Sequence, residues 1–286
     1  MKVSVITVCY NAVSNIEKTI RSVLEQTYSD IEYIVIDGGS IDGTIDIINK
    51  YSNYITRFVS ESDNGIYDAM NKGIKLSSGE WLSFMNAGDI YTSSNTLKLF
   101  VEEIPLFNQD NKSTIKILRG NIVRVYPQIK VLSTGITKQK PGLIDMLNNT
   151  FHHQACLIHS SLFKEFGLYS TEYKLCSDWK FFFDCVVLHH VESKYVNMVV
   201  SHFMMDGESS LNTTEYIKEQ RHYIKKVYGE ELSEILYELS VYRKSFFIRQ
   251  YYILHELLIN NIPPRLFVCL LTIKRIVKSV FGFQVN

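Results

Sequence analysis

The chain has 286 residues, of which 46% are hydrophobic and 21% charged, a balance that is typical of a globular protein and excludes a disordered one. Its 30 basic and 30 acidic residues cancel, which argues against nucleic acid as a partner, because proteins that bind it are usually basic. The five cysteines are widely spaced and form no C-x-x-C pair, so we expect reduced thiols in a cytoplasmic protein.

The first part of the chain alternates between strand and helix patterns. Strands are predicted at residues 2–8, 31–36, 55–61 and 81–85, with helices starting near residues 16, 44 and 66 between them. Ser14 and Glu17 form the pattern of a capping box for the first helix. This alternation predicts an α/β fold with a mostly parallel central sheet flanked by helices.

The second part of the chain is less regular. It contains predicted strands at residues 115–126, 129–135, 151–159 and 195–203, and a predicted helix at 177–188. From about residue 213 the pattern is helical to the end, with breaks at Gly229 and Pro263. We therefore predict a main domain at residues 1–205 and a helical C-terminal extension at 206–286.

Polar clusters follow three of the predicted strands. They are Tyr10 with Asn11, residues 37–44 and residues 86–89. In open α/β sheets, ligands bind beyond the carboxyl ends of the strands, so these clusters predict a ligand site. The chain has neither a G-x-G-x-x-G loop nor a Walker A loop there, which argues against a dehydrogenase or a P-loop enzyme and leaves another nucleotide ligand.

Five motifs resemble those of the family 2 glycosyltransferases, in the order of that family. They lie at residues 3–11, 37–44, 61–73, 79–89 and, in two pieces, 153–154 with 174–179. The resemblance implies a GT-A-like fold and transfer of a sugar from a nucleotide-sugar donor. Their form is similar to the branch found in bacterial capsule, O-antigen and colanic-acid gene clusters.

The resemblance implies contacts with the nucleotide, UDP or GDP. Asp37 would bind the nucleobase, and Thr7, Tyr10 and Asn11 would contact base and ribose. The alternatives are a solvated turn residue for Asp37 and core packing for Tyr10. Asp42 is expected to cap the next helix.

Further contacts are expected near the diphosphate and the donor sugar. Asp68 and Asn71 lie three residues apart on one helix face, where an exposed polar face is the alternative. His153 is expected to contact the pyrophosphate or the acceptor, but not to share a metal ion with His152, because neighbours on a strand point to opposite faces. The segment at 203–210 resembles a loop that closes over the donor.

The sequence NAGD at residues 86–89 is the expected metal site. The family usually writes this site as Asp-x-Asp-Asp, whereas here Asp89 is the only carboxylate and Gly88 stands for the second one. We predict Mg²⁺ or Mn²⁺ on Asp89, because these ions prefer oxygen ligands and Mg²⁺ takes few from protein. Asn86 is expected to supply a carbonyl ligand or to bind a sugar hydroxyl.

Asp178 is the predicted catalytic base. An inverting transfer needs one carboxylate that takes the proton of the acceptor hydroxyl, and the resemblance assigns this role to Asp178. Its aromatic neighbours, including Trp179, predict a raised pKa through desolvation. The alternative role is a helix N-cap together with Ser177.

We therefore predict an inverting hexosyl- or N-acetylhexosaminyl-type glycosyltransferase that acts on a saccharide acceptor, expected to be lipid-linked, in bacterial surface-polysaccharide biosynthesis. A sugar-nucleotide-binding protein without turnover is the first alternative, because the 86–89 segment lacks the second Asp. A glycosidase with two carboxylates is another, against which the Asp37 loop argues.

The zero net charge hides an asymmetry along the chain. Residues 241–286 carry a net charge of +6, so residues 1–240 carry −6. Basic residues alternate with aromatic and aliphatic ones in this tail, a pattern typical of peripheral contact with the inner face of an anionic membrane. Packing on the main domain or in a homodimer is the alternative, and the sequence does not choose between them.

Overall fold

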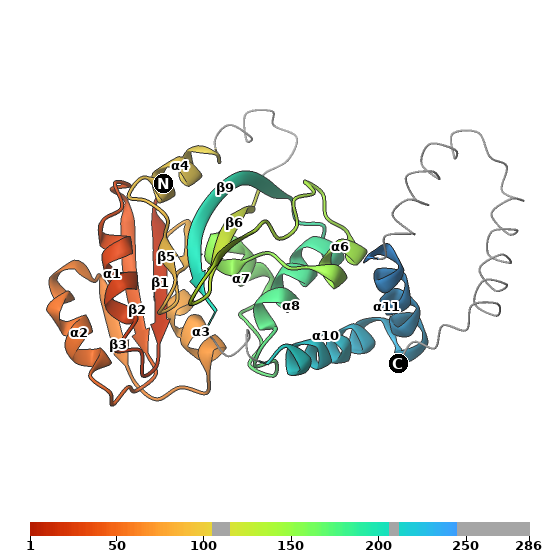
Figure 1. Cartoon of the computed structure of the whole chain (residues 1–286), viewed down its shortest axis with the longest axis horizontal. Helices are drawn as coiled ribbons and strands as arrows, with labels where there is room; N and C mark the ends of the chain where they lie inside the picture. Colours follow the sequence, from red (N-terminus) through yellow and green to blue (C-terminus); the bar gives the residue numbers. More distant parts are fainter. Residues whose placement is uncertain (105–114, 206–211, 245–286) are drawn as a thin grey trace, which may run out of the picture. The chain divides into compact units, whose positions relative to one another are not determined.

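The computed structural model describes residues 1–104, 115–205 and 212–244 (Figure 1). Predictions for the loop beyond residue 205, for Pro263 and for nearly all of the basic tail lie outside the described residues. The chain divides into two compact units, Met1–Glu234 and Ile235–Asn286, and the domain boundary predicted at residue 205 stays a prediction. Within the described ranges, no helix is both long and apolar enough to cross a membrane.

The first unit is built on one mixed sheet. Its strands are β1 (Val3–Cys9), β2 (Ile31–Asp37), β3 (Arg57–Ser60), β4 (Trp81–Phe84), β5 (Ile90–Tyr91), β6 (Ile117–Val125), β7 (Lys130–Ser133), β8 (Cys156–His159) and β9 (Ser193–Met204). The order is β3-β2-β1-β4-β8-β6-β9-β5, with β7 on β6. The strands β3, β2, β1 and β4 are parallel, as predicted, and β6 and β7, in the strand ranges predicted at 115–126 and 129–135, pair antiparallel.

The described residues also form α-helices. They are α1 (Ile16–Leu24), α2 (Thr44–Lys50), α3 (Ile66–Leu76), α4 (Thr96–Glu102), α6 (Leu143–Asn148), α7 (Ser161–Phe166), α8 (Ser177–Phe183), α10 (Thr213–Tyr228) and α11 (Glu230–Lys244). A 3-10 turn, η2 (His153–Ala155), precedes β8, and α8 continues into a π-helical turn, η3 (Asp184–Leu188). Helix α10 ends at Gly229, where a break was predicted and φ is 80°.

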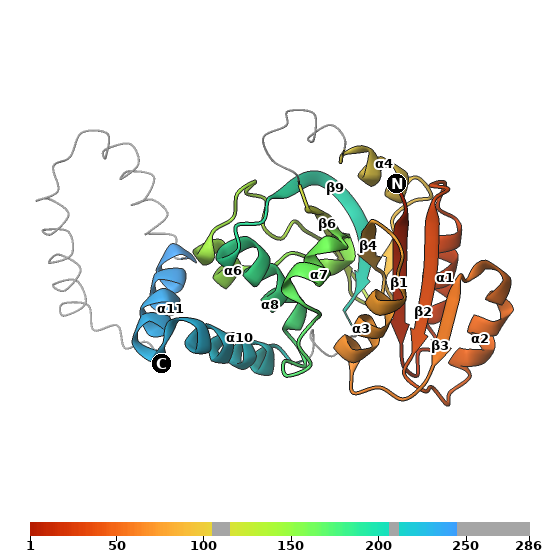
Figure 2. The same cartoon turned by 180° about the vertical axis from the view of Figure 1, so that it is seen from behind.

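Alternating side chains of β1 and β2 explain why helices cover both faces. Val5 and Val35 join one core cluster with Ile20 of α1. On the other face, Gly73 of α3 lies against Ile6. Figures 1 and 2 show α1 and α2 on one side of the parallel strands and α3 on the other. Both faces are therefore buried, which accounts for the apolar run from Tyr33 to Ile36 in β2.

Two local predictions are wrong. No side chain caps α1, so the Ser14–Glu17 capping box does not form. Instead, Glu17 accepts hydrogen bonds from Arg21 at 3.1 Å and Tyr51 at 2.7 Å, and these donors compete for its carboxylate. The strand predicted over 151–159 is confined to β8, because the 3-10 turn η2 occupies its middle.

Gly73 sets the distance between α3 and the sheet. A Cβ on Gly73 would lie 2.4 Å from Cγ2 of Ile6, which is fully buried. We expect Gly73→Ala to lower the free energy of unfolding by about 1–3 kcal/mol, because overpacking outweighs the better helix propensity of alanine. Urea denaturation measures this, with exposed Lys75→Ala on the same helix as control. Equal stability of Gly73→Ala and wild type would contradict this packing.

Candidate active site

The carboxyl ends of β1, β2 and β4 meet at one edge of the sheet, because these strands are parallel neighbours. Gly38 N–H, after β2, donates to Cys9 O at 2.9 Å. Ala87 N–H, after β4, donates to Val8 O at 3.0 Å. The three predicted polar clusters are thus brought together around the end of β1.

Asp37 organises the loop that follows β2. Its side chain is fully buried, and Oδ2 accepts the N–H groups of Gly39 at 3.0 Å and Ser40 at 2.9 Å. Ser60 Oγ donates to the same oxygen at 2.7 Å. Burial raises the pKa of Asp37, but hydrogen bonds from Ser40, Ser60 and the loop outweigh burial and lower it. The carboxylate is held within the protein, and its contact with a nucleobase stays a prediction.

Tyr10 and Asp63 flank the same loop. Tyr10 is 63% exposed, so the alternative of core packing is wrong. A Cβ on Gly38 would lie 2.5 Å from Asp63 Oδ2 and 3.4 Å from Cδ2 of the Tyr10 ring. A carboxylate and an exposed ring therefore stand side by side at the end of β1 and β2. Asp63 was not predicted individually, and its only signal is its place in the 61–73 motif.

Three other predicted contacts have partners within the protein. Thr7 is fully buried, and its hydroxyl donates to Met85 O at 2.7 Å. The Asn71 amide bonds both N–H and C=O of Tyr169, at 3.0 and 2.8 Å. Asn11 Oδ1 accepts a backbone N–H of the loop after β2 at 3.0 Å. These bonds give all three side chains a structural role, and their contacts with the donor stay predictions.

Asp68 lies in the first turn of α3. Its Oδ2 accepts the Asn64 N–H at 3.0 Å and lies 3.9 Å from Lys72 Nζ. Lys72 also pairs with Glu61 at 2.9 Å. Asp68 and Lys72 therefore hold the loop between β3 and α3. After β2, Asp42 accepts the Thr44 N–H at 3.0 Å, but the N-cap residue of α2 is Gly43 and no side chain caps this helix, so the predicted capping role of Asp42 is wrong.

Asp178 lies between two donors from distant parts of the chain. The Tyr67 hydroxyl donates to Asp178 Oδ1 at 2.8 Å, and His153 Nδ1 lies 2.9 Å from Oδ2. The antiparallel pairing of β8 with β4 puts the η2 turn, and so His153, beside the end of β4. There Asn86 Nδ2 lies 3.3 Å from His153 Nε2. His152 instead bonds Ser133 at 3.0 Å, so the two histidines do not converge.

Neighbours in space, more than burial, set the charge of Asp178. Burial raises its pKa, as predicted, but hydrogen bonds from His153 and Tyr67 outweigh burial, so the pKa is lowered. The predicted net rise is therefore wrong. For His153, burial lowers the pKa, whereas the hydrogen bond to Asp178 and the charge of Asp89 raise it above the ordinary value. Each group thus shifts the pKa of the other toward the charged form.

Asn86 and Asp89 offer oxygen atoms at the end of β4. Asp89 is 4% exposed, and its Oδ2 accepts the Asn86 N–H at 3.2 Å. Asn86 Oδ1 is buried and has no hydrogen-bond partner among the described residues. Within the described ranges, no cluster of three or more His, Cys, Asp or Glu could hold a metal ion. One amide oxygen without a partner and one carboxylate, both in the short loop after β4, fit a hard cation that takes most of its ligands from a substrate.

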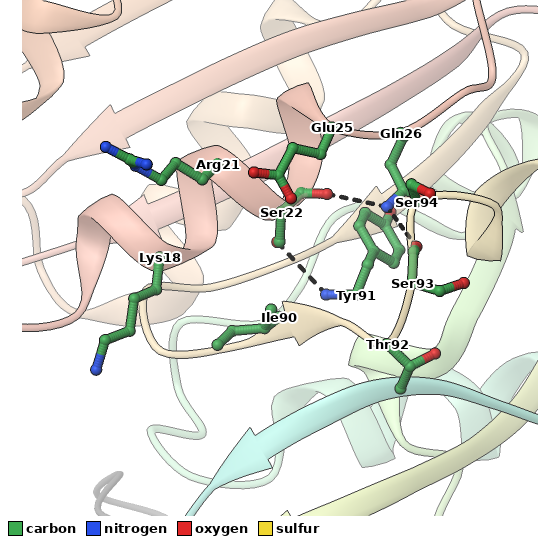
Figure 3. A pocket seen from close by; sticks show the side chains of 10 residues that line it. All are labelled: Lys18, Arg21, Ser22, Glu25, Gln26, Ile90, Tyr91, Thr92, Ser93 and Ser94. Carbon is green, nitrogen blue, oxygen red and sulfur yellow. Dashed lines mark hydrogen bonds between the residues drawn. The ribbon is translucent and has the colours of Figure 1, made fainter.

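A pocket of about 310 Å³ lies elsewhere on the first unit (Figure 3). Helix α1 lines it with residues that include Lys18 and Arg21, and the chain from Ile90 to Ser94 forms the other wall. None of the predicted site residues lines it. The predicted chemistry is therefore concentrated at the strand ends, not in this pocket.

The sequence has relatives among known proteins. Residues 4–165 match the family model described as Glycosyl transferase family 2. A PGL/p-HBAD biosynthesis glycosyltransferase of Mycobacterium bovis (strain BCG / Pasteur 1173P2) is 29% identical, over 75% of this chain and 82% of its own. An uncharacterized glycosyltransferase of Rickettsia typhi is 27% identical, over 99% of this chain and 92% of its own.

Solved structures share the fold at lower identity. S. aureus TarS 1–349 in complex with UDP has a TM-score of 0.62 and 20% identity, over 85% of this chain and 71% of that one. Mannosyltransferase PcManGT from Pyrobaculum calidifontis, in complex with GDP-Man and Mn²⁺, has a TM-score of 0.60 and 14% identity, over 99% and 88%. The predicted GT-A-like α/β fold is confirmed. With more than half of its residues in the family match, the chain belongs to glycosyl transferase family 2.

Proposed function

We propose that the protein is an inverting glycosyltransferase that moves a sugar from a nucleotide-diphosphate donor to a hydroxyl of a saccharide. The observation that carries this proposal is Asp178, a carboxylate that Tyr67 and His153 keep ionised near the ends of the parallel strands. In an inverting transfer, one such carboxylate takes the acceptor proton as the hydroxyl attacks the anomeric carbon. Family membership supports the same class of reaction.

The donor nucleotide is proposed to bind at Tyr10 and Asp63. The exposed Tyr10 ring offers a surface on which a base stacks, and the Asp63 carboxylate offers an acceptor for a base N–H. Asp37 supports this end by holding the loop, and Asp68 is proposed to face the diphosphate and the sugar. UDP in the TarS structure and GDP-Man in the PcManGT structure support a nucleoside-diphosphate donor.

A substitution at Gly38 tests the proposed binding of the donor nucleotide at Tyr10 and Asp63. We expect Gly38→Ala to raise the donor KM about tenfold with less effect on kcat, because the new methyl group displaces Asp63 and Tyr10. Initial rates at varied donor concentration measure this. The matched control is Gly142→Ala, where the nearest atom to a Cβ is Asp145 Oδ2 at 3.9 Å. An unchanged donor KM in Gly38→Ala would refute the proposal that the nucleotide binds at Tyr10 and Asp63.

A divalent cation, Mg²⁺ or Mn²⁺, is proposed as cofactor. Asp89 and the orphaned Oδ1 of Asn86 would hold it, and Mn²⁺ in the PcManGT structure supports such an ion. When bound, it would stabilise the charge that develops on the diphosphate leaving group. His153 contacts both Asn86 and Asp178. We propose that it orients Asp178 and also contacts the donor or the acceptor.

A lipid-linked saccharide of a bacterial surface polysaccharide is the proposed acceptor, used at the inner face of the cytoplasmic membrane. The motif form and the +6 charge of residues 241–286 support this proposal. That segment lies almost entirely outside the described residues, so its membrane contact rests on sequence alone. If deleting it left membrane association unchanged in cell fractionation, packing or a homodimer would be its role.

The second candidate is a sugar-nucleotide-binding protein without turnover, which Gly88 in place of the second family Asp favours. A screen of UDP and GDP sugars, with and without Mn²⁺, separates the two functions. Calorimetry reports binding, and nucleotide release in the presence of acceptor lipid reports transfer. We expect one donor to give both binding in calorimetry and acceptor-dependent release of its nucleotide. Binding without this release would favour the second candidate.

A further inference from the structure

One distant carboxylate holds the segment that leads into Asp178. Glu219 of α10 accepts the Lys174 N–H on Oε1 at 2.9 Å. Its Oε2 accepts the N–H groups of Leu175 at 2.9 Å and Cys176 at 3.1 Å. Three successive backbone donors therefore converge on Glu219 at the start of α8. Cys176 is the N-cap residue of α8, so its N–H has no intrahelical partner, and a carboxylate near this helix start is also stabilised by the helix dipole.

This segment is tied directly to the proposed base. Asp178 follows Cys176 by two residues, in the first turn of α8. The Tyr67 hydroxyl lies 3.1 Å from Leu175 O and 2.8 Å from Asp178 Oδ1, so it bridges the segment and the carboxylate. A shift of residues 174–176 would therefore move both the backbone of Asp178 and the hydroxyl that binds it.

Helix α10 packs on the rest of the first unit through residues other than Glu219. Tyr223 and Ile224 of α10 are buried, and the Tyr223 hydroxyl bonds Asp184 after α8. The rings of Trp179 and Tyr223 meet edge to face at 6.1 Å. Both views show α10 alongside α8 (Figures 1 and 2). Removing the Glu219 carboxylate should thus leave the helix in place while releasing the three N–H groups.

We propose that Glu219 is a positioning residue for transfer, which fixes Asp178 against the acceptor hydroxyl through the backbone of residues 174–176. The inference rests on the proposed function of Asp178. A positioning role for Glu219 would add a residue of α10 to the candidate active site. Helix α10 lies beyond residues 4–165 of the family match. Glu219 touches no reacting atom in this account and acts only through the segment that it holds.

The kinetic test compares Glu219→Ala with Glu219→Gln and Glu215→Ala. We expect Glu219→Ala to lower kcat about 10- to 100-fold with a nearly unchanged donor KM, because orientation of the base is lost. Glu219→Gln keeps one acceptor oxygen and should recover part of that loss. Among the described residues, Glu215 on the same helix forms an exposed ion pair with Lys218, so Glu215→Ala should behave as wild type.

A double variant separates positioning from general stability. If Glu219 acts through Asp178, adding Glu219→Ala to Asp178→Asn should lower kcat no further. If the kcat losses of the two single variants multiplied in the double variant, the proposal would be overturned. A wild-type kcat in Glu219→Ala alone would also overturn it.

Hydrogen exchange tests the positioning without any turnover. In the full-length Glu219→Ala protein, the amides of residues 174–176 should lose protection, while those of the Glu215→Ala control should not. Unchanged protection in Glu219→Ala would overturn the proposal. If the wild type transferred no sugar at all, the proposed function would fail, and the exchange result would still decide whether Glu219 holds this segment.

Discussion

Replacing Asp178 by asparagine should lower kcat about a thousandfold, within the range typical of a lost general base. Asn keeps the size of the side chain and a partner for Tyr67, but it cannot take the acceptor proton. The donor KM should change little, because Asp178 acts on the acceptor hydroxyl. Acceptor-dependent nucleotide release measures both constants.

The control for this variant is Asp46→Asn, an exposed carboxylate in the first turn of α2, which should keep wild-type kinetics. A thermal unfolding midpoint close to that of wild type would show that the loss in Asp178→Asn is chemical. Near-normal transfer by Asp178→Asn with a confirmed donor would show that another group is the base.

Replacing Asp89 by asparagine should have the second largest effect. We expect kcat/KM to fall about a hundredfold and the Mn²⁺ concentration for half-maximal rate to rise, because the one carboxylate ligand of the proposed ion is lost. Rates at varied Mn²⁺ and Mg²⁺ measure both effects. Dialysis of the wild type against EDTA should abolish transfer, and added Mn²⁺ should restore it.

Asp46→Asn also serves as the control here, with an unchanged metal dependence. Full activity of the wild type after EDTA treatment would exclude the metal and leave Asp89 a structural role through its bond with the Asn86 N–H.

Local sequence patterns predicted the parallel half of the fold well. Apolar runs and helix periodicity located β1 to β4, and the start predicted near residue 66 matches the first residue of α3, Ile66. The short β5 has only two residues and exists through its pairing with β9, so no local pattern could show it. The 3-10 turn η2 was hidden in the same way, inside an apolar stretch that resembled a strand.

The site could be predicted in part. Motifs named Asp178, His153 and Asn86, which the structure brings into one hydrogen-bonded chain. They did not single out Tyr67 or Glu219, because each meets its partners more than forty positions away and is an ordinary helix residue by local pattern.

Partners in space also explain the pKa of Asp178. Trp179 and the phenylalanines after it are visible in the sequence and favour a raised pKa. The donors that reverse this effect, His153 and Tyr67, become neighbours of Asp178 only in the folded chain. Thr7 illustrates the same limit, because its burial depends on how β1 and β4 pair.

The central claim is a single-displacement transfer in which Asp178 is the base. The most direct measurement is the anomeric configuration of the product, read by proton NMR for the wild type with the donor identified by the screen. We predict the configuration opposite to that of the donor sugar. A product that retained the donor's configuration would contradict the account.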